Sequence, residues 1–349
     1  MSEMEEHPTP LELQVPLGET VPEREAFSEE LLSVGSGDEL RLLYEKFIDR
    51  IGANGIIHEV ESVNPTCHGV GHPLGRVIFS KLGKIGPSLR TCQDACNSGC
   101  MHGVFMESFA PDRRQVHEAA SDTGKHPYFI QRVKDQIPTL CSREILNDLY
   151  KPGDCAHGVG HAIMHITDYD IPRAMDHCRL FGSYPMVYYC ATGGYMEYVT
   201  ENDPKNRIEK SLFYPCDTGE YPAACFRYKM VHVIQRPDYL SGKLKDEDIA
   251  ARCIAMENKY RWGCFHGFGN AKSREIRSGG VGIPTVCRFG TDADQTVCID
   301  GAVERLAKYH PDKAQAACRK LEGWRRDLCL SGANRGMYDL DKSFKYYLR

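Results

Sequence analysis

Regularly spaced cysteines are the feature that most constrains the fold of this 349-residue chain. Eight of the 16 cysteines follow one another at steps of 31 to 39 residues, apart from one step of 55 with an insertion within 110–150. They are Cys67, Cys100, Cys155, Cys190, Cys225, Cys264, Cys298 and Cys329. Such steps are typical of stacked two-helix repeats. The spacing predicts an all-α chain of about eight disulfide-stapled helix pairs, which form a curved solenoid or a closed superhelix.

Each of these cysteines except Cys67 has a partner 8 to 14 residues upstream. A cysteine near the end of one helix then faces a cysteine at the start of the next, within disulfide reach. The pairs are Cys92/Cys100, Cys141/Cys155, Cys178/Cys190, Cys216/Cys225, Cys253/Cys264, Cys287/Cys298 and Cys318/Cys329. Cys67 and Cys96 remain, and we pair them with each other. Zinc–thiolate sites are the alternative, but the chain has no Cys-x-x-Cys, so we favour disulfides.

The chain divides into an N-terminal segment and a repeat domain. Residues 1–36 contain nine Glu, one Arg and four Pro with little periodicity, which predicts a disordered acidic tether. A helical pattern starts near Asp38 and continues through a repeat domain over 37–349. We expect its repeats near 37–80, 81–112, 140–168, 172–202, 207–236, 246–275, 281–309 and 312–340.

The number of cysteines also bears on the compartment. Eight disulfides need oxidising conditions, so we expect a periplasmic, cell-surface or secreted protein. The first residues are polar and carry no signal peptide, so we expect a signal or membrane tether outside the given residues. A cytosolic protein with reduced thiols is the alternative. The net charge of −5 argues against a nucleic-acid partner, and no apolar run is long enough to span a membrane.

A second pattern accompanies the cysteines. The phrase His-Gly-x-Gly-His follows the repeat cysteine at 68–72 and at 157–161, and a third copy near 264–270 keeps His266 but has Asn270 as its last residue. The repeats after the first two copies contain Gly-x-x-Met-Glu, which ends at Glu107 in one and Glu197 in the other. The alternation indicates a duplicated two-repeat module. Its copies lie near 67–109, 155–199 and, in altered form, 264–305.

The repeated histidines predict a metal site. Residues four apart on a helix share a face, so the two histidines of each phrase point the same way. The candidate ligands are His68, His72, His102 and Glu107 from the first module, His157, His161 and Glu197 from the second, and His266 from the third. Imidazole and carboxylate suit a divalent transition metal such as zinc, iron or copper. If the array curls tightly, the first two sets converge on one dinuclear site.

The glycines within the phrases support the same interpretation. Gly69, Gly71, Gly158 and Gly160 lower helix stability, and we expect them to leave space for an ion with bound water or substrate. Close helix contact and packed, structural histidines are the alternative interpretation, since copying one repeat also copies its histidines.

Two functions remain open. The first is a metal-dependent hydrolase or oxidoreductase with its site on the concave face, where Glu107 or Glu197 serves as the general base. The second is a scaffold that grips a peptide or glycan in the concave groove. Motifs of serine hydrolases, phosphate loops, dinucleotide folds and His-Glu-x-x-His proteases are absent.

Over about residues 60–335 the chain resembles the secreted, cysteine-rich α/α-repeat proteins of bacteria, with one cysteine per helix and a glycine after the second. That resemblance implies an extracytoplasmic interaction scaffold, although the paired cysteines are less evenly spaced here and those proteins lack the histidine phrase. The phrase at 67–76 resembles phrases of uncharacterised bacterial proteins. The ligand set is similar to that of hemerythrin-like di-iron proteins, whose ligand order and four-helix bundle differ. No residue role is carried over from these families.

Overall fold

The computed structural model describes residues 13–35, 37–64, 67–93, 95–109, 126–146, 149–201 and 211–334. These residues belong to two compact units, unit 1 (residues 1–168) and unit 2 (residues 169–349). Every regular element among them is a helix, which confirms the predicted all-α class. None of these helices is long and apolar enough to cross a membrane.

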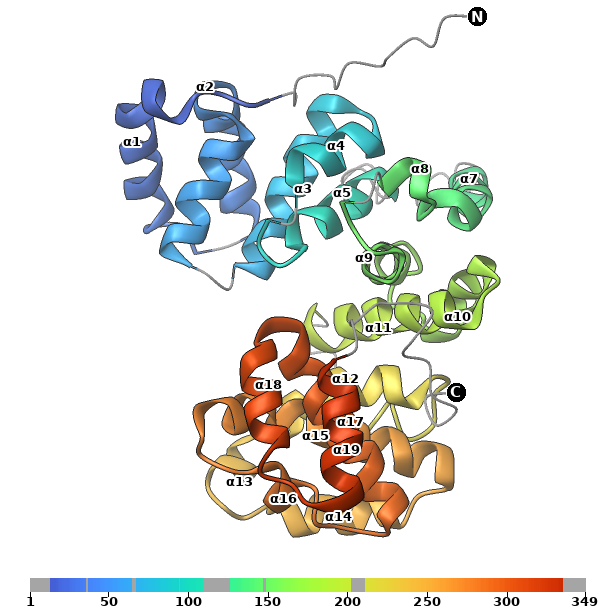
Figure 1. Ribbon diagram of the computed structural model, residues 1–349. Coiled ribbons are helices and arrows are strands. Elements are labelled where there is room, and N and C mark those ends of the chain that lie inside the picture. The colour runs from blue at the N-terminus through green and yellow to red at the C-terminus, as the bar shows by residue number, and fades with distance from the viewer. Residues whose placement is uncertain are drawn as a thin grey trace, which may run out of the picture. The chain divides into compact units, whose positions relative to one another are not determined.

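Unit 1 consists of a 3-10 helix and eight α-helices in the part of the chain that is described (Figure 1). They are η1 (Leu17–Thr20), α1 (Val21–Leu31), α2 (Gly37–Val63), α3 (His68–Leu82), α4 (Ile85–Cys92), α5 (Gly99–Phe109), α7 (His126–Leu140), α8 (Arg143–Leu146) and α9 (Pro152–Ile166). The central helix α5 packs against α3 on one side and α9 on another, and α3 also packs against α2.

Unit 2 repeats the alternation of short and long helices. Its elements are α10 (Ile171–Cys178), η2 (Arg179–Phe181), α11 (Tyr184–Glu201), α12 (Pro222–Val233), α13 (Pro237–Leu240), α14 (Asp246–Ile254), α15 (Asn258–Ser278), α16 (Ile283–Val286), α17 (Asp292–Tyr309), α18 (Pro311–Cys318) and α19 (Gly323–Ala333). The helices α11, α12, α15, α17 and α19 each pack against the next of the series. Successive repeats therefore lie side by side within a unit, and the shape of the complete array stays a prediction.

All 16 cysteines form disulfides, and each of the eight predicted pairs is present. Their Cα atoms lie 4.8 to 5.6 Å apart, within the normal range for a disulfide. The pair that was left over in the sequence, Cys67 and Cys96, joins the residue before α3 to the turn before α5. Zinc–thiolate sites are excluded by this pairing, because a disulfide sulfur is not a thiolate.

The N-terminal segment differs from the expected tether. The structure places helix α1 at Val21–Leu31, where Pro22 occupies the first turn. Phe27 on α1 is fully buried, and its ring lies 6.1 Å from that of Tyr44 and 5.4 Å from that of Phe47, both on α2. Phe27 thus helps to dock α1 on α2, together with the ion pair of Arg24 and Glu59, and the high Glu content of the segment obscured this signal. Residues 1–12 and 36 of the predicted tether lie outside the described residues.

Glycines allow the backbones of α3 and α5 to touch. A Cβ atom on Gly75 would overlap the carbonyl oxygen of Cys100, one on Gly99 would overlap that of His68, and one on Gly103 would overlap that of His72. Only a residue without Cβ permits this approach. This contact sets the axial register of α3 relative to α5, and so it places the histidines of the two helices next to each other.

The expected role of the phrase glycines is only partly correct. A Cβ on Gly71 would lie 2.9 Å from the backbone nitrogen of Cys100, so Gly71 serves helix contact. A Cβ on Gly158 would lie 3.0 Å from a carbon of the His102 ring. Of these three glycines, Gly69 has no atom within 4 Å of the position of a Cβ, so open space lies beside Gly69, and the role of Gly160 stays a prediction.

We expect Gly75→Ala to lower the free energy of unfolding of unit 1 by about 1–3 kcal/mol, because the new methyl group forces two backbones apart. Gly69→Ala is the matched control, and it should leave stability unchanged or raise it by up to about 1 kcal/mol, since alanine favours a helix. Thermal unfolding of the full chain measures both effects. Equal stability of the two variants would contradict the proposed backbone contact.

In unit 2 a buried carboxylate joins α15 to α17. Asp294 is fully buried; its Oδ1 accepts a hydrogen bond of 2.8 Å from Nε of Arg261, and its Oδ2 accepts from Nη2 of Arg261 and, at 2.7 Å, from the backbone N–H and the hydroxyl of Thr291. Burial by itself would raise the pKa of Asp294. The hydrogen bonds from Arg261 and Thr291 and the charge of Arg261 outweigh burial, so the pKa lies below its usual value.

This shift predicts a pH dependence of stability. A carboxylate with a depressed pKa in the folded state stabilises the protein above the unfolded value of 3.8, and that stabilisation is lost as the pH falls through the folded pKa. The melting temperature of Asp294→Asn should therefore lie below that of the wild type at pH 6, and the gap should close below pH of about 4. Calorimetry of both proteins from pH 6 to pH 2 measures it. A gap that stays constant to pH 2 would exclude the ionised carboxylate as its cause.

Candidate metal centre

Five histidines from three helices of unit 1 gather into one group. The group, called the imidazole cluster below, consists of His68 and His72 on α3, His102 on α5, and His157 and His161 on α9. Because α5 packs between α3 and α9, it carries the central member. The ring of His102 lies 4.8 Å from that of His68, 5.5 Å from His72, 5.1 Å from His157 and 4.6 Å from His161.

The nitrogen atoms of the cluster are close enough to share an ion. One ring nitrogen each of His68, His102 and His161 lies within 4.8 Å of the other two. The Nε2 atoms of His157 and His161 are 3.3 Å apart. Nitrogen ligands of a tetrahedral zinc ion are separated by roughly 3.3 Å, since each lies about 2.0–2.1 Å from the metal. The ligand atoms of His68, His102 and His161, which lie within 4.8 Å of one another, would have to move closer together to surround one zinc ion.

The environment favours the neutral form of two of these imidazoles, His72 and His102. Burial lowers the pKa of His72 and of His102 well below the ordinary value, and the neighbouring histidines, together with Arg76 in the case of His72, lower it further. A neutral imidazole has one nitrogen with a free lone pair, which is the form that binds a metal. His72 and His102 are thus in the protonation state that metal binding requires.

Two ring nitrogens of the cluster lack any hydrogen-bond partner although they are buried: Nε2 of His72 and Nδ1 of His102. A buried polar atom without a partner is rare and costs about 1–3 kcal/mol, so each one asks for an explanation. A bound ion explains both atoms together. The donor set of the cluster therefore fits a transition metal.

Glu107 does not take the role that the sequence assigned to it. Its Oε1 accepts a hydrogen bond of 3.0 Å from the hydroxyl of Ser80 and one of 3.3 Å from Arg41, and Arg76 lies 3.9 Å from Oε2. The carboxylate is thus neutralised by two arginines and ties α5 to α2 and α3. It is not a member of the group of ligand atoms formed by His68, His102 and His161.

Glu197 lies in unit 2, not in the unit that holds the imidazole cluster. It is on α11, its residue is 1% exposed, and its Oε1 accepts a hydrogen bond of 3.2 Å from the hydroxyl of Tyr169. Within unit 1 the structure thus brings together the histidines of the first two modules without Glu107, and the role of Glu197 stays a prediction.

The third copy of the histidine phrase forms a different buried network in unit 2. Nε2 of His266 lies 3.4 Å from Glu304, and Glu304 forms an ion pair of 2.9 Å with Arg227. Burial alone would raise the pKa of Glu304, but Arg227 and His266 hold it well below its usual range. Asn270, which replaces the second histidine of the phrase, accepts a hydrogen bond of 3.2 Å from Arg305.

Sequence reasoning did not identify Glu304 and Arg227 as partners of His266. The available signal was the altered end of the third module, where Arg305 stands at the position of Glu107 and Glu197 and a glutamate precedes it. In this copy fixed side-chain charges surround the histidine, so His266 is better described as part of an ion-pair network than as a member of the imidazole cluster.

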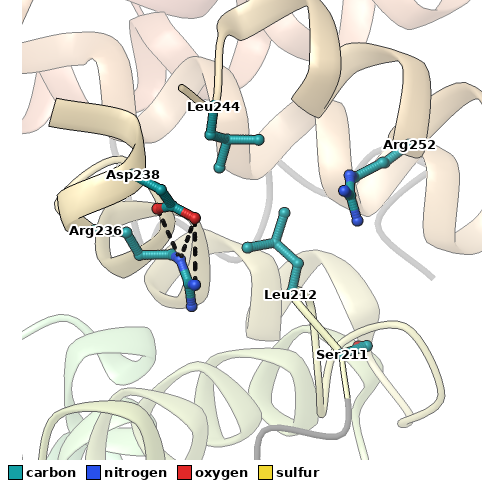
Figure 2. Close-up of a pocket in the computed structure, with 6 residues that line it drawn as sticks. All are labelled: Ser211, Leu212, Arg236, Asp238, Leu244 and Arg252. Atoms are coloured by element: carbon teal, nitrogen blue, oxygen red, sulfur yellow. Dashed lines mark hydrogen bonds and ion pairs between the residues drawn. The ribbon is translucent and has the colours of Figure 1, made fainter. Parts of the chain in front are cut away.

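Unit 2 also contains a cavity of about 270 Å³ that none of the predicted site residues lines. Figure 2 shows its lining, which is Ser211, Leu212, Arg236, Asp238, Leu244 and Arg252. Asp238 forms an ion pair of 3.1 Å with Arg236, and two leucines form the apolar part of the lining. Among the described residues that line the cavity there is no histidine and no group of potential metal ligands.

Comparisons with known proteins give no relative from which a function can be transferred. No family model, no curated protein and no solved structure matches the chain. The site must therefore be interpreted from its own geometry.

We predict that Glu107→Gln lowers the free energy of unfolding by about 1–3 kcal/mol without reducing metal uptake, because it leaves Arg41 and Arg76 without their buried carboxylate. Glu45→Gln is the control: Glu45 also pairs with Arg41, at 3.0 Å, but its side chain is 43% exposed. That change should cost less than about 0.5 kcal/mol. Chemical denaturation measures stability, and metal analysis of the purified variants measures uptake. If folded Glu107→Gln instead lost its metal, Glu107 would have to be a metal ligand.

Proposed function

We propose that the chain is an extracytoplasmic metal-binding protein whose unit 1 holds a divalent transition-metal ion through His68, His102 and His161. The observation that carries this proposal is the convergence of three helices on one point, with four imidazoles within 5.5 Å of the ring of His102. His72 and His157 flank the three proposed ligands and are available as further ligands or as partners of bound water.

Energetics favours an ion over simple packing of the histidines. Five imidazoles in one place bury many polar nitrogen atoms, and the buried Nε2 of His72 and Nδ1 of His102 have no hydrogen-bond partner. Protonation does not solve the problem, because a charge on one ring repels the next and is poorly solvated here. A divalent cation attracts all the lone pairs at once, and its binding stabilises the folded state by an amount that grows with the logarithm of its affinity.

The ligand chemistry narrows the metal to a class. All ligands of the proposed shell are imidazole nitrogens, and every cysteine is consumed in a disulfide. Imidazole suits zinc, copper, iron and nickel, and is unsuited to calcium or magnesium, which prefer oxygen. We infer zinc or copper as the first candidates, because both are bound well by neutral histidine.

We further propose that the metal site is catalytic and that the chain is a metal-dependent enzyme. Three histidines with an open fourth position are the ligand set of several catalytic zinc sites, where the ion activates water or polarises a carbonyl. In this chain the side of the cluster at His68 and His72 is only half-buried, and Gly69 leaves space beside it. A substrate would approach from that side. Because two arginines neutralise Glu107, the proposed enzyme does not use this carboxylate as its base.

The compartment belongs to the proposal as well. Eight disulfides suit an oxidising environment, which we infer to be the periplasm, the cell surface or the exterior of the cell. The resemblance of the stapled helix pairs to secreted α/α-repeat proteins supports the same location. In such a place the site would take up its ion from the surroundings.

Metal analysis of the full chain tests the proposal. Protein made in an oxidising compartment and purified without chelator should contain zinc or copper, and the stripped protein should bind Zn²⁺ or Cu²⁺ in calorimetry. His102→Ala should weaken binding by about 100-fold or more, since loss of an orienting partner alone costs about 10–100-fold and this change removes a ligand. His58→Ala is the control, because His58 lies on α2 with 52% of its side chain exposed and pairs with Glu59.

The competing scaffold function predicts the opposite results. In that case the stripped protein binds neither ion, neither ion raises its melting temperature, and His102→Ala changes only stability. A peptide- or glycan-binding scaffold with packed histidines would then be the better description of the chain.

A further inference from the structure

A short segment next to the imidazole cluster has an unusual backbone. Residues 96–98, called the left-handed segment below, have φ angles of 54°, 50° and 67° in succession, and none of them is glycine. The left-handed conformation costs an L-residue roughly 1–2 kcal/mol, and asparagine, the central residue of the segment, tolerates it best. Three such residues in a row persist only where surrounding contacts hold them.

Those contacts come from α2 and from the start of α3. Cys96 is joined by its disulfide to Cys67, the residue directly before α3, with their Cα atoms 4.8 Å apart. The backbone N–H of Cys96 donates a hydrogen bond of 2.9 Å to Glu61 on α2. The next residue after the segment, Gly99, lies so close to the backbone of His68 that a Cβ would overlap the carbonyl oxygen.

The segment in turn contacts two members of the imidazole cluster. Nδ1 of His68 lies 3.0 Å from the carbonyl oxygen of Asn97. A carbonyl only accepts, so Nδ1 must carry the proton and Nε2 the lone pair. The carbonyl oxygen of Ser98 accepts a hydrogen bond of 3.1 Å from the backbone N–H of His102, in the first turn of α5. One strained turn therefore contacts two of the three helices that present ligands.

We propose that the left-handed segment is the positioning element of the metal site, and that Asn97 is a positioning residue that acts through His68. Its carbonyl fixes the ring of His68 in the Nδ1–H tautomer and aims Nε2 at the other imidazoles. This inference rests on the proposed metal function for its purpose, but not for its geometry. Hydrogen-bond partners of this kind change metal affinity by about 10–100-fold when they are lost.

Two substitutions of Asn97 separate backbone from side chain. Asn97→Gly and Asn97→Val both remove the amide and keep a backbone carbonyl, but only glycine accepts a φ of 50° without strain. We expect ¹⁵N NMR of the metal-free protein to show the Nδ1–H tautomer of His68 in the wild type and in Asn97→Gly. In Asn97→Val the signals should shift toward a mixture of tautomers, and affinity for Zn²⁺ should fall by about 10–100-fold.

A second pair of variants covers a failure of Asn97→Val to fold. Cys67→Ser with Cys96→Ser releases the segment and should shift the tautomer and weaken Zn²⁺ binding in the same way. Cys318→Ser with Cys329→Ser removes a disulfide of unit 2 with a similar Cα separation, 5.3 Å, and should change neither. These controls separate positioning from a general loss of stability.

The proposal is overturned if the wild type lacks the Nδ1–H tautomer, if Asn97→Gly shifts it as much as Asn97→Val, or if the segment can be released without any shift. Its failure differs from failure of the proposed function. A wild type with the expected tautomer and no affinity for Zn²⁺ or Cu²⁺ would support the positioning of His68 and remove the metal site.

Discussion

The site depends on how closely helix backbones approach one another. Glycines on both α3 and α5 remove the Cβ atoms that would hold these helices apart, so that carbonyl oxygens of one helix lie directly against the other. At an ordinary distance between helices, the rings of His68 and His102 would not meet at 4.8 Å. Unit 2 uses the same contact, since a Cβ on Gly301 would overlap the carbonyl oxygen of His266.

The same backbone contact is surrounded by different buried polar side chains in the two units. In unit 1 it brings together five histidines, and no fixed charge of the chain is among the ligand atoms of His68, His102 and His161. In unit 2 it surrounds His266 with Glu304 and Arg227, so the chain supplies both charges itself. A repeat that has been copied thus keeps its backbone geometry while its buried polar residues change. This explains why the third phrase keeps the glycines of the first two but has an asparagine at its end.

The sequence predicted the fold well because each repeat encodes its geometry locally. Cysteine spacing was sufficient for seven disulfides, Cys67 and Cys96 were paired because they were the two that remained, and the i, i+4 rule correctly paired His68 with His72. The environment of Glu107 was not accessible, because Arg41 and Ser80 lie far away in the sequence and no period relates them to it. For the same reason the docking of Phe27 was missed, since one buried ring gives no periodic signal in an acidic segment.

The short sequence separation of most disulfide-bonded cysteines affects how the chain folds and oxidises. Seven of the eight disulfides close loops of 8 to 14 residues, so each joins neighbours that meet as soon as one hairpin has formed. Wrong pairings between distant thiols therefore compete poorly during oxidative folding. The eighth bond, between Cys67 and Cys96, spans 29 residues and must wait until α3 has docked. Oxidation of this last pair would then mark a correctly assembled first unit.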